Sequence, residues 1–145
     1  MMTLSRRDLA ALLPALAIRA TAQPTPAPAV LPARIYHSAQ IPYTGSDEKK
    51  GRRFFIGTTH TGFNIETHET ILGAGMDTHP PHKHEHPEML IIVSGTLEVH
   101  MEDKSETAEA GSIVYFSSNI LHNAHNPGTT PCRYYVIELR GSSPG

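Results

Sequence analysis

The sequence predicts an all-β domain, a sandwich or barrel, on two observations. From Arg53 onward, short apolar runs alternate with turn residues, and several runs place an apolar side chain at every second position. This spacing marks half-buried strands, and many short strands with turns at regular intervals are typical of sandwiches and barrels. After residue 23 no stretch shows the periodicity of an amphipathic helix. The 145 residues suffice for one such domain.

The expected strands follow in chain order after a charged, glycine-containing segment, residues 46–53, which predicts a surface loop. The run from Met89 to Val93 is continuously apolar, which is typical of a strand covered on both sides. A tight hairpin is expected at residues 93–96, and another turn around Gly111. The remaining expected strands are residues 54–56, 63–71, 97–101, 112–116 and 133–139.

Residues 1–22 are typical of a secretory signal peptide. Arg6 and Arg7 supply a positively charged start, a short apolar stretch follows, and Ala20 and Ala22 give the small-x-small pattern that signal peptidase accepts. The apolar stretch is too short to span a bilayer in the mature protein. The paired arginines resemble a bacterial twin-arginine signal. We therefore expect a bacterial periplasmic or secreted protein with no stable membrane anchor after cleavage.

Residues 23–45 carry spaced prolines in an Ala/Thr-rich context, which favours extended conformations and predicts a linker or arm outside the core. The domain itself is expected over residues 46–141. A net charge of −2, without a basic stripe or a nucleic-acid motif, argues against nucleic acid as a partner. The single cysteine, Cys132, allows no intramolecular disulfide and is expected to be a small buried apolar residue.

Histidine is the unusual component of the sequence, since four of the ten fall within residues 79–86. His82 and His84 are two apart, so on a strand both imidazoles would point to one face, and Glu88 shares that parity. His122 follows an apolar run by one short loop, so a neighbouring strand could carry it to the same cavity. Nitrogen ligands with one carboxylate suit Mn, Fe, Ni or Zn better than Ca or Mg. The sequence therefore predicts a site for one divalent transition metal.

Two motifs built on these residues resemble the two motifs of the cupin family. The first motif consists of a Gly, an H-x-H pair, a Glu and, six residues later, another Gly. From His82 to Gly95 the sequence matches H-x-H-x3-E-x6-G at every position, while the opening Gly75 lies one residue further away than usual. The resemblance covers roughly residues 53–140.

The second motif is matched with one departure. Gly111, His122 and Asn126 stand at the expected spacing, whereas Ser117 and Asn119 replace the Pro and Gly that the motif usually carries. Because Asn tolerates the positive φ that Gly usually supplies, we expect the turn to survive this replacement.

The resemblance implies a small single-domain cupin of the RmlC-like superfamily, whose fold is a double-stranded β-helix, the jelly-roll or cupin barrel. It also implies that His82, His84, Glu88 and His122 are the metal ligands. Such a site can keep coordination positions for water, dioxygen or substrate, as catalytic metal sites do. Small cupins commonly form dimers, so the resemblance further implies a homodimer.

The sequence predicts no catalytic residue beyond the ligands. His86, His79 and His125 adjoin the motifs and are candidates for groups beside the metal, His86 in a supporting position and the other two as proton shuttles. His68 alternates with its neighbours, and the sequence leaves open which face of its strand it occupies.

Two functional classes stay open. The first is a metal-dependent enzyme acting on a small organic molecule, as an oxygenase, isomerase or lyase. A His-rich site with a carboxylate suits Fe or Mn and so favours a dioxygenase. The alternative is a non-catalytic periplasmic protein that binds a small ligand or the metal itself. The fold alone does not select one of them.

Overall fold

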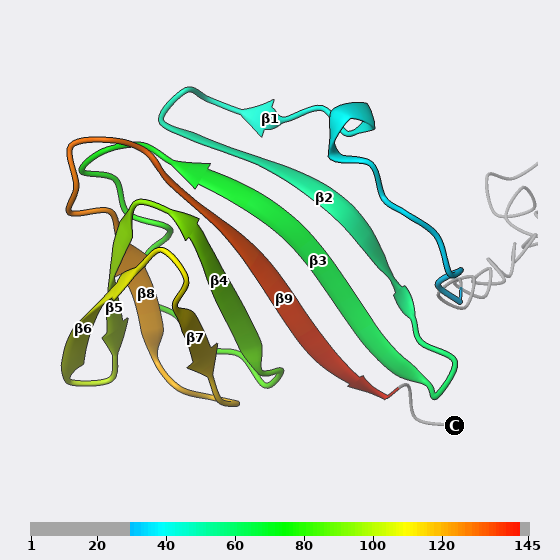
Figure 1. Ribbon diagram of the computed structural model, residues 1–145. Coiled ribbons are helices and arrows are strands. Elements are labelled where there is room, and N and C mark those ends of the chain that lie inside the picture. The colour runs from blue at the N-terminus through cyan, green and yellow to red at the C-terminus, as the bar shows by residue number, and fades with distance from the viewer. Residues whose placement is uncertain (1–29, 143–145) are drawn as a thin grey trace, which may run out of the picture.

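The computed structural model describes residues 30–142, which form two antiparallel sheets facing each other (Figure 1). This confirms the predicted all-β jelly-roll. The predicted signal peptide, residues 1–22, and the first part of the arm, residues 23–29, lie outside the described residues. The elements are the 3-10 helix η1 (Ser38–Gln40) and the strands β1 (Thr44–Gly45), β2 (Lys49–Thr58), β3 (Phe63–Leu72), β4 (Glu88–Ser94), β5 (Thr96–Met101), β6 (Lys104–Glu109), β7 (Ile113–Phe116), β8 (His122–His125) and β9 (Cys132–Ser142).

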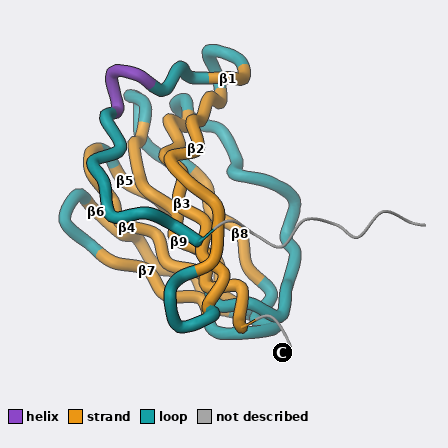
Figure 2. The backbone as a smooth tube through the Cα atoms, turned by 90° about the vertical axis from the view of Figure 1, so that its right-hand side faces the viewer, coloured by secondary structure: helices purple, strands orange, loops and turns teal. Residues whose placement is uncertain are grey.

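The larger sheet has the strand order β1-β2-β3-β9-β4-β7, and the smaller sheet has the order β6-β5-β8. Strand β9 lies between β3 and β4, so the larger sheet joins segments that are far apart in sequence. Loops and turns connect the strands at both ends of the sheets (Figure 2). Among residues 30–142, no helix has both the length and the apolar character needed to cross a membrane.

The core lies between the sheets and is filled by alternate side chains. In β4, Leu90 and Ile92 are buried, whereas Met89 and Ile91 on the other side are only partly buried. The expectation that this strand is covered on both sides is therefore wrong for the part of the chain that the structure describes. The continuous apolar run supplies one buried side and one partly exposed apolar side.

Two local expectations are also wrong. Residues 93–96 form no hairpin, because β4 and β5 belong to different sheets and the chain crosses between them at Gly95. The charged segment 46–53 is not a loop throughout, since β2 begins at Lys49 and pairs with β3 from its first residue. Pairing with a neighbouring strand overrides the local composition here, because strand preference depends strongly on context.

The described part of the arm, residues 30–45, lies along β2 at the edge of the larger sheet. Strand β1 pairs with β2, and the Tyr43 hydroxyl donates a 2.8 Å hydrogen bond to Glu69 of β3. Glu69 is fully buried and is also paired with Arg52 and Arg133. Since a buried carboxylate is tolerated only with such partners, this cluster fixes the arm to the sheet.

Candidate metal centre

The backbone brings His82 and His122 side by side. The amide of His82 donates to the His122 carbonyl at 3.1 Å, and the amide of His122 donates back at 2.9 Å, so the two residues form an antiparallel pair at the start of β8. Residues paired in this way point their side chains to the same face. The centroids of the two imidazoles are accordingly 4.7 Å apart.

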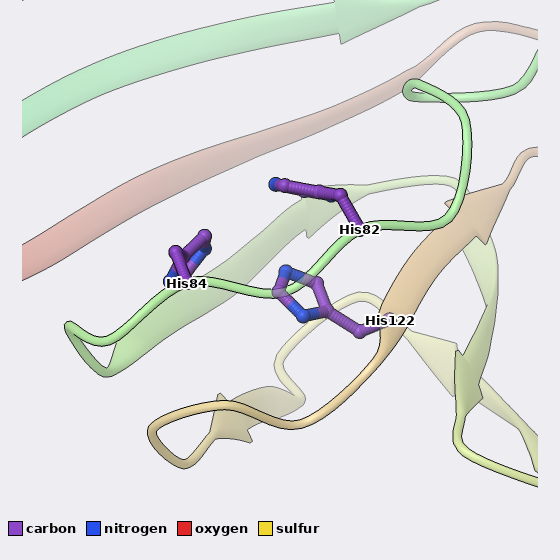
Figure 3. A group of neighbouring side chains, drawn as sticks. All are labelled: His82, His84 and His122. Carbon is purple, nitrogen blue, oxygen red and sulfur yellow. The ribbon is translucent and has the colours of Figure 1, made fainter.

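His84 completes a group of three imidazoles. It lies on the segment that leads into β4, and its ring centroid is 5.2 Å from that of His82 and 5.0 Å from that of His122. One ring nitrogen from each residue lies within 4.8 Å of the other two. Figure 3 shows the three rings gathered in the space between this segment and β8.

Two ring nitrogens of this group lack a partner. The Nδ1 atoms of His84 and His122 lie 2.6 and 2.9 Å from the carbonyl oxygens of His86 and Ile120. A proton on each Nδ1 satisfies these carbonyls and leaves a lone pair on Nε2. Both Nε2 atoms are buried without a hydrogen-bond partner among the described residues, which is costly unless something binds there. A metal ion fits this requirement.

Glu88, the fourth predicted ligand, opens β4 beside His84. Its Oε2 atom lies 3.4 Å from His84 Nε2, a separation that suits two ligands each bound at about 2.1 Å to one ion. Glu88 does not belong to the group whose ligand atoms all lie within 4.8 Å of one another. The structure therefore brings the three histidines together and places Glu88 against one of them.

The electrostatics of the site favour a cation. Burial, reinforced by the neighbouring Glu138 carboxylate, raises the pKa of Glu88 to about 7, and a bound metal ion would reverse that shift. Burial also lowers the pKa of the His122 imidazole, against the opposing effect of its contact with the Ile120 carbonyl. Neutral imidazole is the form that binds metals, so His122 is already in its ligating form near neutral pH.

The His86 side chain is held in place beside the proposed metal ligands. Its ring lies flat on that of His84, with 3.9 Å between the centroids and 4° between the planes. Its Nε2 atom is 3.1 Å from Glu138 Oε2, and Arg140 lies 2.6 Å from the same oxygen. The Arg140 guanidinium thus neutralises the carboxylate that positions His86.

The two other candidate histidines are placed differently. His79 packs edge-on against His82, with ring centroids 4.1 Å apart, and lines the same cavity. His125 is not in the cavity wall, and its Nδ1 atom instead lies 3.0 Å from Asp77 Oδ1. His79 is therefore near enough to act on a bound molecule, whereas His125 is not.

The site opens into a cavity of about 330 Å³ between the sheets. Most of the residues in its wall were not predicted from the sequence. Tyr134 is 3% exposed and faces inward, and the opposite parity of Tyr134 and Tyr135 predicts that one of them does so. The sequence did not indicate Lys49 as a site residue, because its segment has the composition of a loop. The wall comprises Lys49, His68, Thr70, Thr78, His79, His82, His84, His86, Glu88, Leu90, Phe116, His122, Asn123, Ala124, Tyr134, Val136, Glu138 and Arg140.

A second group of potential ligand atoms comes from Glu66, His68 and Glu138. Its carboxylates already have cationic partners, since Glu66 lies 2.7 Å from Arg53 and 2.9 Å from Arg140, which also neutralises Glu138. Carboxylates satisfied by guanidinium groups have little left to offer a metal ion, and we assign no metal to this group.

Comparison with known proteins gives a family and a fold. The family model described as the Cupin domain matches residues 65–138, about half of the chain. None of the curated protein sequences compared with the chain matches it. Solved structures share the fold at low sequence identity, and three of them illustrate the range.

An RmlC-like cupin from Shewanella frigidimarina is 16% identical, with a TM-score of 0.61 and coverage of 72% of this chain and 88% of that one. KdgF from Halomonas sp. is also 16% identical, with a TM-score of 0.61 and coverage of 74% and 95%. The polyketide cyclase RemF from Streptomyces resistomycificus is 18% identical, with a TM-score of 0.60 and coverage of 79% and 83%. At these identities the likeness shows the fold alone.

Proposed function

This chain belongs to the cupin family, and we propose that it is a metal-dependent enzyme acting on a small organic molecule. His82, His84, Glu88 and His122 would hold one divalent transition metal, Mn, Fe, Ni or Zn. One observation carries the proposal: the Nε2 atoms of His84 and His122 are buried and make no hydrogen bond within residues 30–142, while their Nδ1 atoms face backbone carbonyls. This arrangement presents lone pairs toward the cavity, as metal-ligating histidines do.

The donor set favours dioxygen chemistry. Three imidazoles and a carboxylate suit iron or manganese, and such an ion, when bound, supplies a Lewis acid and a redox partner for dioxygen. The rest of the site comes from the chain itself. The carbonyls of His86 and Ile120 orient two ligands, and Arg140 holds the Glu138 carboxylate against the His86 ring.

The remaining wall determines what can enter. Leu90, Phe116 and Val136 give the cavity an apolar floor, which keeps water away from a bound carbon skeleton. His79 stands at the edge of the same cavity and can exchange a proton with a bound molecule, since imidazole titrates near working pH. A cavity of about 330 Å³ restricts the choice to small molecules.

Metal content tests this proposal directly. We expect the full chain, purified without a polyhistidine tag, to hold about one metal per chain by mass spectrometry. His84→Ala and His122→Ala should each lose most of that metal, because each removes an Nε2 ligand. His125→Ala is the matched control, since that imidazole lies outside the cavity wall. Unchanged metal content in both ligand variants would refute the assignment.

Turnover then separates the enzyme from the non-catalytic alternative. Oxygen uptake or product formation by the metal-loaded protein, measured across small organic molecules, should disappear in the two ligand variants and persist in His125→Ala. Thermal stabilisation by a small molecule with no turnover under air would instead favour a binding protein.

A further inference from the structure

The cavity wall contains one cation without a counter-charge among residues 30–142, and that cation is Lys49. The other charged groups in the wall are accounted for: Glu88 is a proposed metal ligand beside His84, and the Glu138 carboxylate, which contacts His86, is neutralised by Arg140. No carboxylate of the described residues comes within 4.0 Å of the Lys49 ammonium. Its neighbour Lys50 points to the other face of β2, where it pairs with Asp47 at 3.9 Å.

The Lys49 ammonium is held at the cavity although the residue is exposed as a whole. Its Nζ atom donates to the backbone carbonyl of Thr78. Thr78 is itself fixed, because it is 6% exposed and its hydroxyl accepts a 3.0 Å hydrogen bond from the Ala124 amide of β8. A single carbonyl does not compensate an ammonium group that has been partly withdrawn from water, and burial accordingly lowers the pKa of Lys49.

The proposed metal ion would add to the excess of positive charge that Lys49 brings to the cavity. The Glu88 carboxylate offsets only part of the charge of a divalent ion, the Arg140 charge is cancelled by Glu138, and Lys49 adds one positive charge. A cavity with an excess of positive charge attracts an anion. The apolar side chains of Leu90, Phe116 and Val136 in the wall can contact the carbon skeleton of an organic anion, which a small inorganic ion lacks.

We propose that the ligand of this cavity is a small organic carboxylate whose carboxylate group pairs with the Lys49 ammonium. The inference rests on the proposed function in taking the cavity as the substrate site, and it names the chemical class of the substrate. Lys49 is then a specificity-determining residue contributed by the first position of β2 in the larger sheet, and it lines the same cavity as His122 of the smaller sheet.

Ligand titration followed by NMR tests the inference on the full chain, in metal-free and zinc-loaded form. The probes are succinate, its uncharged match succinamide, and inorganic phosphate. We expect succinate to bind more tightly than the other two, and Lys49→Gln to weaken succinate about tenfold, because a hydrogen bond to a charged group is lost. Lys49→Arg should retain most of the affinity, and Lys50→Gln, the matched control, should leave it unchanged.

Equal succinate affinity in Lys49→Gln and the parent chain would overturn the inference, and so would binding of succinamide or phosphate as tight as that of succinate. A melting temperature for each variant separates loss of binding from loss of folding. Failure of the zinc-loaded form to hold metal would count against the proposed function instead. The metal-free titration still decides the role of Lys49 in that case.

Discussion

Cys132 shows how burial controls the chemistry of a single residue. It is fully buried in the core, and this burial raises the pKa of its thiol to about 11. Because the thiolate is the reactive form, we expect iodoacetamide to label the folded protein very slowly at pH 8 and rapidly in denaturant. The chain has one cysteine, so the mass increase reports on this site alone. Rapid labelling of the folded protein would contradict the prediction.

The raised pKa of Cys132 also determines how the free energy of unfolding depends on pH. A thiol whose pKa is raised from 9.0 to about 11 on folding is favoured in its protonated form by the folded state. Its contribution to the free energy of unfolding is therefore present below pH 9 and is lost as the pH rises through about 11. Labelling above pH 11 then mixes thiolate formation with unfolding, which is why the test belongs at pH 8.

Individual motif residues were predictable from the sequence where spacing alone defines them. Asn119 has a φ of 62°, which confirms that Asn replaces the glycine of the turn. Its amide also donates 2.7 Å to the His84 carbonyl and so ties the second motif to the first. The role of Asn126 was not predictable. Its side-chain nitrogen lies within 3.0 Å of three carbonyls, among them those of Leu72 and Gly73. The carbonyls of Leu72 and Gly73 are distant from Asn126 in sequence, so no local pattern reveals these contacts.

At the scale of strands and turns, alanine substitutions at two glycines allow the cost of backbone strain to be distinguished from the cost of a steric clash. Gly95 and Gly111 have φ values of 78° and 94°, so alanine at either position should cost about 1–2 kcal/mol in backbone strain. A Cβ on Gly95 would also lie 2.9 Å from Cys132 Cα, whereas one on Gly111 would meet no atom within 4 Å. We expect Gly95→Ala to lower the free energy of unfolding by about 1–3 kcal/mol more than Gly111→Ala, measured by urea titration.

This pair of variants also examines the crossing between the sheets. Gly95 lies where the chain leaves β4 and enters β5, directly against the first residue of β9. Equal destabilisation by the two alanines would mean that the neighbouring backbone moves without cost. A tightly packed interior argues against such movement.

Strand positions could be predicted from the apolar pattern, but strand partners could not. Alternation places His68 and Thr70 on one face of β3, yet it does not say which face is inside. Register decides this: His68 pairs with Val136 and Thr70 with Tyr134, and all four line the cavity. Because β9 follows β3 by some sixty residues in the chain, the pairing depends on long-range packing that local propensity does not contain.

At the scale of the whole molecule, the candidate site joins the two sheets. Glu88 belongs to the larger sheet and His122 to the smaller one, while His82 and His84 lie on the segment that connects β3 to β4 and pairs with β8 through His82. The resemblance to the cupin motifs predicts this convergence, whereas spacing in the sequence alone does not show that two distant motifs meet. The homodimer stays a prediction, and so do the signal peptide at residues 1–22 and export.

A metal held by both sheets should stabilise the entire domain. A ligand that binds only the folded state adds about 2.7 kcal/mol to the free energy of unfolding at a hundredfold excess over its dissociation constant. We therefore expect zinc to raise the melting temperature of the metal-free chain and chelation to reverse the rise. His122→Ala should abolish the effect by removing the ligand of the smaller sheet, whereas His125→Ala, on the same strand but outside the cavity wall, should retain it. An equal rise in both variants would show that zinc binds elsewhere and that the two sheets are not joined through this site.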